Sequence, residues 1–395
     1  MTREEIYSAC LKAMGKGNCL LLEAATGTGK TFQSIKLVNH LSAKEGKKLK
    51  ILLLVAKRVH KVTWKEEIEK WGGIKADVIM ECYESLRKHT KEIFDVVLAD
   101  EVHHVQSKVR LDLLSMIRFK YFIGLSATIP RNLKSWFKWK YKSQIVSCDI
   151  LEAIEDDVLP EPEIVLFPLQ LDNKVPCEEW EINQKSPGPI ARGTYNELWK
   201  YKKNKQHAIL KCTQKQKSNE LNAECLWFKN KFNITRNEGL KNIWLQKCGQ
   251  RLEFYANCKL YLLKLITEHL KKYRTITFCK TIEQCEEVGN WCIHSKNADS
   301  DVIYNLFNQK KINHITAVNI LNENANLVDC KYAIFGNLSS SEIVQVQRCG
   351  RALRHKHPVI IVPYYEGTRE AEVVEGMFKD YNKEFIRVIH TIKEI

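Results

Sequence analysis

Short runs of apolar residues recur through the first 130 residues, separated by polar or glycine-rich segments. The runs cover residues 19–23, 51–55, 94–99 and 121–125. Apolar runs of this length, bounded by turn-forming residues, are typical of buried strands. A helix of about Thr31 to Leu41 is predicted between the first two runs. Strands that alternate with helices indicate a parallel sheet whose crossover connections are helical.

A second alternation of this kind begins near residue 258. It predicts a helix over 260–273 and strands over 275–279, 332–336 and 359–362. Between the two regions, Leu159-Pro160-Glu161-Pro162 has the composition of a linker. We therefore expect an α/β fold of two parallel-sheet lobes. The predicted domains are residues 1–168, 169–257 and 258–395.

The middle region, from about Gln170 to Cys258, loses the alternation and is predicted to be a mainly helical insertion. Its first half is rich in basic residues, with only Glu197 opposing them between 192 and 217. Aromatic residues lie among the basic ones, and three of the tryptophans are Trp199, Trp227 and Trp244. Two interpretations stay open: a surface that binds or splits a nucleic-acid strand, or tryptophans that form the small core of the insertion.

Composition narrows the class of partner. The 395 residues carry a formal charge of +15, which favours a polyanion, either nucleic acid or an anionic membrane. The apolar runs all fall short of the about 18 residues that a membrane span needs. The start of the chain lacks the apolar stretch of a signal peptide. The 14 cysteines include no C-x-x-C pair and match no zinc-binding spacing, so a reduced, cytoplasmic protein without structural metal is expected.

A glycine-rich segment directly follows the first predicted strand. It reads Ala24-Ala25-Thr26-Gly27-Thr28-Gly29-Lys30-Thr31, and a predicted helix follows it. Glycines at this place let backbone N–H groups curl around phosphates at a helix N-terminus. Lys30 would place its charge on the β- and γ-phosphates, and the Thr31 hydroxyl would bind Mg²⁺. Residues 26–31, Thr26, Gly27, Thr28, Gly29, Lys30 and Thr31, are thus the candidate nucleotide-binding residues.

Three further segments accompany this loop. Asp100-Glu101-Val102-His103 follows the strand at 94–99, and Ser126-Ala127-Thr128 follows the strand at 121–125. In the second lobe stands Gln347-Arg348-Cys349-Gly350-Arg351-Ala352-Leu353-Arg354. Ligands of open α/β sheets bind beyond the carboxyl ends of the strands, so the first two segments are placed beside the phosphate loop. Arg351 and Arg354 are three residues apart and would share one face of a helix.

Together and in this order, the four segments resemble those of superfamily 2 helicases of the DExH type. The resemblance implies two RecA-like lobes that bind ATP and Mg²⁺ between them. It implies that Asp100 holds Mg²⁺, that Glu101 polarises the attacking water, and that His103 couples this site to Ser126 and Thr128. Gln347 would contact the γ-phosphate or its water. Arg351 and Arg354 would stabilise charge on the transferring phosphoryl group.

The resemblance also suggests a track for nucleic acid. In this superfamily both lobes hold the sugar–phosphate backbone of one strand, through contacts that position the strand without reading its sequence. The candidates here are Lys57 and Arg58 after the second strand, and Lys280 and Thr281 after the first strand of the second lobe. Weaker matches are 83–86 and 319–326. The glutamine that contacts adenine in many relatives is not found between Met1 and Ala24.

The expected function is ATP hydrolysis coupled to translocation along a nucleic-acid strand or to its unwinding, with DNA favoured over RNA. Segments 294–296 and 362–370 resemble those of compact phage and bacterial relatives, which implies the cytoplasm of a bacterium or of a phage-infected host. The protein is expected to act as a monomer and not at a membrane. Two alternatives stay open: a translocase that anneals strands or displaces proteins without net unwinding, and a nucleic-acid-binding scaffold with a vestigial ATPase.

Overall fold

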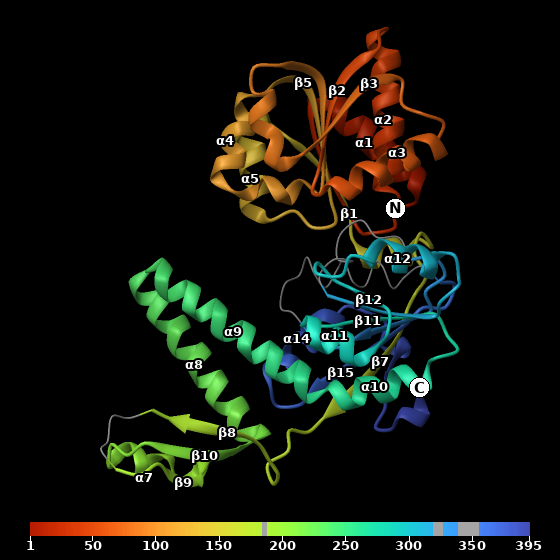
Figure 1. Ribbon diagram of the computed structural model, residues 1–395. Coiled ribbons are helices and arrows are strands. Elements are labelled where there is room, and N and C mark those ends of the chain that lie inside the picture. Colours follow the sequence, from red (N-terminus) through yellow and green to blue (C-terminus); the bar gives the residue numbers. More distant parts are fainter. Residues whose placement is uncertain (184–187, 319–326, 339–354) are drawn as a thin grey trace.

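The computed structural model describes residues 1–183, 188–318, 327–338 and 355–395. Two α/β lobes lie one above the other in Figure 1, and a smaller insertion extends from the second lobe. The amino terminus belongs to the first lobe and the carboxyl terminus to the second. No helix among the described residues is both long and apolar enough to cross a membrane.

The first lobe is built on a six-stranded parallel sheet of order β3-β2-β4-β5-β1-β6. Its four predicted strands are present as β1, β2, β4 and β5. The strands are β1 (Cys19–Ala24), β2 (Leu49–Val55), β3 (Ala76–Cys82), β4 (Ile93–Asp100), β5 (Arg118–Ser126) and β6 (Gln144–Cys148). The central strands are apolar on both faces because helices cover both sides of the sheet.

Each face of this sheet has its own hydrophobic core. One face packs against α1 (Arg3–Lys16), α2 (Lys30–Glu45) and α3 (Arg58–Lys70). The other packs against α4 (Lys108–Met116) and α5 (Arg131–Tyr141), together with the 3₁₀ turns η1 (Tyr83–His89) and η2 (Val102–Gln106). Figure 1 shows the two groups of helices on opposite sides of the strands. A short helix, α6 (Ile150–Glu155), leads out of the lobe.

The second lobe is a seven-stranded parallel sheet of order β12-β13-β11-β14-β15-β7-β16. Its strands are β7 (Glu163–Leu169), β11 (Thr275–Phe278), β12 (Cys292–Ile293), β13 (His314–Ala317), β14 (Tyr332–Phe335), β15 (Val359–Tyr365) and β16 (Ile386–Val388). The predicted boundary after residue 168 leaves β7 with the first lobe, whereas its hydrogen bonds to β15 and β16 place it in the second sheet. The chain thus enters the second sheet before it forms the insertion.

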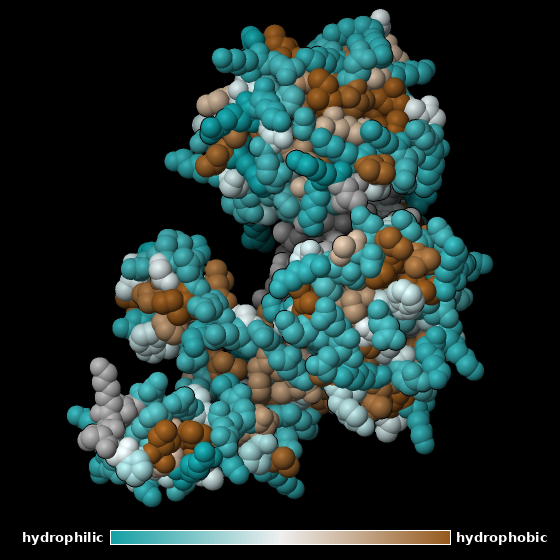
Figure 2. All heavy atoms as spheres, viewed as in Figure 1, coloured by the Kyte–Doolittle hydropathy of each residue, from teal (hydrophilic) through white to brown (hydrophobic). Residues whose placement is uncertain are grey.

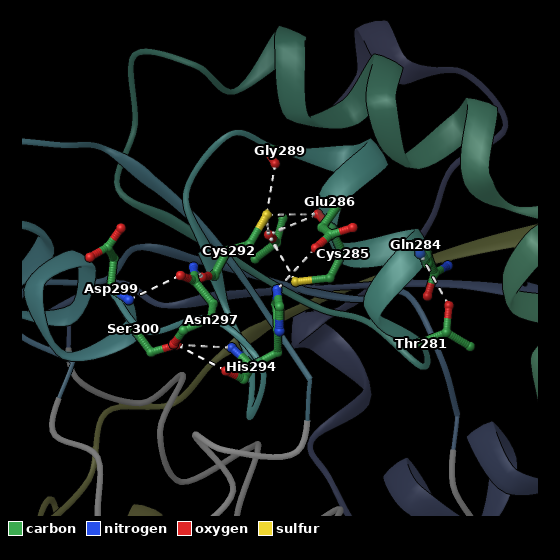
Figure 3. A network of polar contacts seen from close by, with 11 residues as sticks. Thr281, Gln284, Cys285, Glu286, Gly289, Cys292, His294, Asn297, Asp299 and Ser300 are labelled. Carbon is green, nitrogen blue, oxygen red and sulfur yellow. Dashed lines mark hydrogen bonds and ion pairs between the residues drawn. The ribbon is translucent and has the colours of Figure 1, made fainter.

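Helices also cover both faces of the second sheet. They are α10 (Leu260–His269), α11 (Ile282–Val288), α12 (Ser300–Asn308) and α14 (Arg369–Phe378). A polar network holds the turns at the ends of α11 and β12 (Figure 3). Thr281 accepts a hydrogen bond from the backbone N–H of Gln284 and so caps α11. The hydroxyl of Ser300 lies 3.0 Å from the carbonyl oxygen of His294.

The insertion combines a small sheet with a helical hairpin. The hairpin consists of α8 (Gln214–Thr235) and α9 (Glu238–Cys258), which confirms the mainly helical prediction. The sheet was not anticipated: β8 (Pro176–Ile182), β10 (Ala208–Thr213) and β9 (Ala191–Thr194) pair in that order, and α7 (Leu198–Lys203) adjoins them. Charged residues interrupt its strands, so their sequence lacks the continuous apolar runs that mark the strands of the two lobes.

A buried ion pair ties the hairpin to the second lobe. Lys259, between α9 and α10, donates from Nζ to Glu370 at 2.6 Å and to the carbonyl of Pro363 at 3.2 Å. Both side chains of the pair are almost completely buried. Breaking such a pair by removing one partner leaves an uncompensated buried charge, which is strongly unfavourable. We therefore expect the hairpin and the second lobe to keep a fixed relation.

Candidate nucleotide site

The glycine-rich segment forms a tight loop between β1 and α2, as its sequence predicts. Gly27 and Gly29 have φ angles of 103° and 94°, in the left-handed region where a side chain would be strained. The loop delivers the chain to the N-terminus of α2, whose first residue is Lys30. The Lys30 Nζ donates to the carbonyl oxygens of Ala24 at 2.8 Å and Ala25 at 3.3 Å. Backbone N–H groups and a cation thus converge at one helix N-terminus, which suits a phosphate group.

The acidic pair lies at the carboxyl end of β4. Asp100 is the last residue of that strand, and Glu101 follows with a φ of 52°, an unusual conformation for a residue other than glycine. Both side chains are buried, with 6% and 3% of their surface exposed. Burial away from water, and then the neighbouring Glu101, raise the pKa of Asp100. A cation near a buried carboxylate with an acidic neighbour stabilises its ionised form.

Glu101, His103 and Ser126 form a contact network between β4 and β5. The Ser126 hydroxyl lies 3.2 Å from Glu101 Oε2 and 2.9 Å from His103 Nδ1. It also lies 2.8 Å from the carbonyl oxygen of Thr128. The segments at 100–103 and 126–128 are therefore in direct contact, because β4 and β5 are neighbours with their carboxyl ends level. The structure brings together the residues that the resemblance pairs for coupling between the lobes.

Two further side chains hold Asp100 from outside the acidic segment. Trp64 of α3 donates from its indole nitrogen to Asp100 Oδ2 at 2.8 Å. Tyr83, the first residue of η1, donates from its hydroxyl to the Asp100 carbonyl oxygen at 2.6 Å. Trp64 lies within an amphipathic helix and belongs to no sequence motif. Tyr83 is only the first residue of the weakly matching segment 83–86.

Glu23 is another residue that the sequence motifs missed. It lies on β1 just before the phosphate loop, and its two carboxylate oxygens have different partners. Oε1 accepts from the backbone N–H of Ile129 at 2.7 Å, and Oε2 accepts from Lys134 Nζ of α5 at 2.5 Å. Glu23 therefore joins the strand before the phosphate loop to the segment after Thr128. Its signal in the sequence was a charged residue at the end of an otherwise apolar strand.

A cleft of about 560 Å³ lies between the two lobes beside this site. Its first-lobe wall includes Ala25 of the phosphate loop and Thr128, and its second-lobe wall is the end of α14, with Met377 and Tyr381. Parts of both lobes thus meet at the carboxyl ends of the first sheet's strands. Lys30, Thr31, Asp100 and Glu101 are not among its lining residues, so the cleft adjoins the predicted nucleotide site and does not contain those side chains.

The predicted second-lobe residues Gln347, Arg351 and Arg354 lie outside the described residues, as does the segment 319–326. The remaining predicted residues are at turns between strands and helices. Lys57 is the N-cap of α3 after β2, and both it and Arg58 are exposed. Lys280 and Thr281 occupy the corresponding turn between β11 and α11, where the backbone N–H of Lys280 donates to Gln284 at 2.8 Å.

The insertion presents aromatic and basic side chains on its surface. Trp199 and Trp227 are 68% and 53% exposed, so they do not form the core that was one interpretation of the sequence. Trp244 is partly buried and stacks on Phe232, with 6.2 Å between ring centroids. Figure 2 shows apolar patches on the insertion among hydrophilic side chains. Lys202, Lys203 and Lys205 are exposed and take part in no ion pair among the described residues.

The residues present fit a magnesium–nucleotide complex. Mg²⁺ is commonly held by one or two protein oxygens together with phosphate oxygens, without a complete cage of protein ligands. The Thr31 hydroxyl and the Asp100 carboxylate supply oxygens of this kind next to the phosphate loop. Among the described residues, at this site or away from it, no group of three or more His, Cys, Asp or Glu side chains could hold a metal ion by itself.

Two protein families match the chain, one in each lobe. Residues 3–93 match the res subunit of type III restriction enzymes, and residues 258–356 match the helicase conserved C-terminal domain. The second match includes the segment of Gln347, Arg351 and Arg354. No sequence among the curated proteins matches the chain.

Solved structures of helicases share the fold across almost the whole chain. The helicase domain of Hef from Pyrococcus furiosus has a TM-score of 0.50 at 13% identity, covering 95% of this chain and 97% of that one. A variant of Dbp5 from S. cerevisiae, bound to RNA and ADP BeF3, has a TM-score of 0.61 at 10% identity, covering 99% and 91%. At such low sequence identity, the similarity of the structures shows a shared fold and says nothing about the roles of individual residues.

Proposed function

We propose that the chain is a superfamily 2 helicase and that it hydrolyses ATP to move along or unwind a nucleic acid; the family matches in its two lobes and the helicase fold support this proposal. The observation that carries the proposal is the meeting of three segments at one sheet edge. The phosphate loop, the acidic pair and Ser126 lie at the carboxyl ends of β1, β4 and β5, which are neighbours in the order β4-β5-β1. The proposed domains are the segments 1–168, 169–257 and 258–395, except that β7 (Glu163–Leu169) at the end of the first segment belongs to the sheet of the second lobe.

The proposed chemistry divides between positioning and charge stabilisation. The backbone of Thr26, Gly27, Thr28 and Gly29 would cradle the phosphates of ATP while Lys30 neutralises them. Thr31 and Asp100 would hold Mg²⁺, which supplies positive charge against the β- and γ-phosphate oxygens. Glu101 would orient and deprotonate the attacking water. Its contact with Ser126 at 3.2 Å supports a fixed orientation for this carboxylate.

The second lobe is proposed to complete the site. Arg351 and Arg354 would approach the γ-phosphate from the far side of the cleft, with Gln347 beside them. ATP would then favour closure of the lobes because Lys30 and Arg351 contact the same phosphates, and hydrolysis would remove that bridge. His103, Ser126 and Thr128 would transmit the closure, which is supported by their direct contacts and by the position of Thr128 in the cleft wall.

The proposed partner is nucleic acid, with DNA favoured over RNA and one protein molecule acting alone. The net charge of +15 supports a polyanionic partner. Lys57, Arg58, Lys280 and Thr281 are proposed to hold the backbone of the strand. The described cysteines are all free thiols, which supports a reducing setting. The proposed setting is the cytoplasm of a bacterium or of a phage-infected cell. The structure of Dbp5 contains RNA, so RNA has to be compared directly.

The test of the proposed function is ATP turnover measured with single-stranded DNA, duplex DNA, RNA and no nucleic acid. Stimulation by one of them is expected, and a strand-separation assay with that nucleic acid then distinguishes a helicase from a translocase that does not unwind. Turnover that stays at background with all of them would instead favour the nucleic-acid-binding scaffold.

Replacing Lys30 with alanine is expected to abolish ATP hydrolysis while binding of nucleic acid without nucleotide survives. The change removes the cation of the phosphate loop, whereas the proposed strand contacts lie on other turns. Steady-state turnover and oligonucleotide affinity are the two measurements. Lys44→Ala, at the exposed far end of the same helix α2, is the matched control. Full turnover in Lys30→Ala would show that this loop is not the catalytic site.

Neutralising Lys202, Lys203 and Lys205 together tests the insertion. If these exposed lysines lie along the bound nucleic-acid strand, their change to glutamine weakens binding equally for oligonucleotides of different sequence. The slope of log affinity against log salt should fall by about 0.7–0.9 for each phosphate group that the protein no longer neutralises. Basal ATPase activity should not change, because α7 is part of a separate small sheet domain.

The control is a triple change of Lys44, Lys47 and Lys48 to glutamine, at the end of α2 and in the turn that leads from it to the amino end of β2. It removes the same charge from the chain without touching the insertion. If the two triple variants have the same salt slope as the unchanged protein, the insertion lysines are ordinary surface charges.

A further inference from the structure

We propose that Trp64 and Tyr83 couple binding of nucleic acid to binding of nucleotide. Each of them links Asp100 to a segment of the first lobe that is proposed to contact the nucleic acid. The inference rests on the proposed function and adds to it the residues that regulate the site. Both residues are positioning residues, since they would act through Asp100 and touch neither ATP nor the strand.

Trp64 links the turn after β2 to the acidic pair. Helix α3 begins directly after the N-cap Lys57, with Arg58 as its first residue, so the proposed strand contacts and Trp64 belong to one rigid element. The Trp64 side chain is 3% exposed, and its indole N–H donates to Asp100 Oδ2 at 2.8 Å. An indole nitrogen can only donate. The bond therefore sets the orientation of the carboxylate that would hold Mg²⁺.

Tyr83 makes the equivalent link from the turn after β3. Its side chain is 1% exposed, and its hydroxyl donates to the carbonyl oxygen of Asp100 at 2.6 Å. Its ring stacks on His104, with 5.7 Å between centroids. Arg110 reinforces the same connection, since it donates to the His104 carbonyl at 2.9 Å and pairs with Glu84 at 3.1 Å. The weakly matching segment 83–86 is thereby tied to the turn that carries the acidic pair.

The two bonds converge on one buried residue from two different elements. One fixes the side chain of Asp100 and the other fixes its backbone, at the last position of β4 where the chain turns into Glu101. A nucleic-acid strand whose binding shifts α3 or η1 changes the positions of the two hydrogen-bond donors around Asp100. A magnesium–nucleotide complex that reorients Asp100 shifts the donors in return. Coupling of this kind is reciprocal, so each ligand must change the affinity of the other by the same factor.

The experiment measures that factor with the full chain. The dissociation constant of a labelled single-stranded DNA oligonucleotide is determined with and without a non-hydrolysable ATP analogue and Mg²⁺. The reverse titration gives the affinity of the analogue with and without the oligonucleotide. In the unchanged protein we expect a coupling factor within the usual range of about 5- to 150-fold. Trp64→Phe and Tyr83→Phe each remove one donor and keep an aromatic ring; each is expected to lower the factor, and the double variant to bring it close to one.

Matched controls remove the same groups elsewhere in the first lobe. Trp71→Phe deletes an indole donor at the end of the same helix, where it bonds to Glu67 at 2.7 Å. Tyr121→Phe deletes a hydroxyl on β5 that bonds to Glu45 at 2.7 Å. Both controls should keep the coupling factor of the unchanged protein, and thermal unfolding checks that all variants are folded.

Three outcomes overturn the inference. One is a coupling factor in both variants that stays within about twofold of the unchanged protein. Another is complete loss of analogue binding in a folded Trp64→Phe protein, which would make Trp64 part of the nucleotide site itself. The third concerns a Trp64→Phe protein that does not fold. Tyr83→Phe then decides alone, and a coupling factor in that variant equal to that of the unchanged protein overturns the inference. Absence of coupling in the unchanged protein would contradict this inference together with the proposed function, whereas the three outcomes above contradict the inference alone.

Discussion

Replacement of Glu101 by glutamine is expected to leave ATP bound and to slow its hydrolysis by about 10²–10⁴-fold, the usual contribution of a general base. Glutamine keeps the size of the side chain and can still contact the Ser126 hydroxyl, which lies 3.2 Å from Glu101 Oε2. Its amide cannot take a proton from water. Asp100 and Thr31 remain to hold Mg²⁺, so affinity for ATP should stay close to that of the unchanged protein.

Single-turnover hydrolysis and equilibrium binding of ATP measure the two effects separately. The control is Glu92→Gln. Glu92 directly precedes β4, at the opposite end of that strand from Glu101, and its carboxylate accepts a hydrogen bond from Lys50 of β2. This change should leave both quantities unaltered. If affinity for ATP falls in step with the rate in Glu101→Gln, the carboxylate is a metal ligand or a structural group, and the proposed division of roles between Asp100 and Glu101 is wrong.

The other large effect is expected at Arg351, whose change to alanine should lower turnover by about 10³–10⁵-fold. An arginine that crosses the cleft stabilises charge that develops on the phosphoryl group only in the transition state. The loss should therefore be far from additive with that of Glu101→Gln, since both residues act on the same transition state. Turnover at saturating nucleic acid, in both single variants and the double variant, measures the effect and its non-additivity.

Arg369→Ala is the matched control for Arg351. Arg369 begins α14 in the same lobe, is exposed, and pairs with Glu372 one turn along its own helix. Its loss should leave turnover unchanged. Turnover in Arg351→Ala within about threefold of the unchanged protein would remove this arginine from the ATP site, and with it the proposed closure of the two lobes around ATP.

The four central strands of the first sheet could be predicted because they are buried on both faces and therefore read as continuous apolar runs. The two edge strands, β3 and β6, are partly exposed and were not predicted. The same argument placed the phosphate loop, the acidic pair and Ser126 together, since each directly follows such a run. It failed for the small sheet of the insertion, where β8 carries Glu178, Glu179 and Glu181 and is largely exposed. It could not assign β7 either, because the partner strand β15 lies about 190 residues further along the chain.

The roles of single tryptophans illustrate the same limit. Trp64 and Trp199 both stand beside lysines in the sequence, yet one is buried against Asp100 and the other is 68% exposed on the insertion. Nothing local distinguishes them, because burial depends on which element packs over the residue. Glu23 likewise acquires its partners, Ile129 and Lys134, only because β1 and β5 are neighbours.

By itself, the sequence determined the α/β class, the two lobes and the order of the nucleotide-binding segments, since these depend on the periodicity of apolar residues and on motifs a few residues long. Only the tertiary structure decided which side chains support those segments. The indole of Trp64 and the hydroxyl of Tyr83 reach Asp100 across 36 and 17 residues of sequence. Hydrogen bonds of this kind follow from the packing of α3 and η1 against the sheet, which no local pattern of residues encodes.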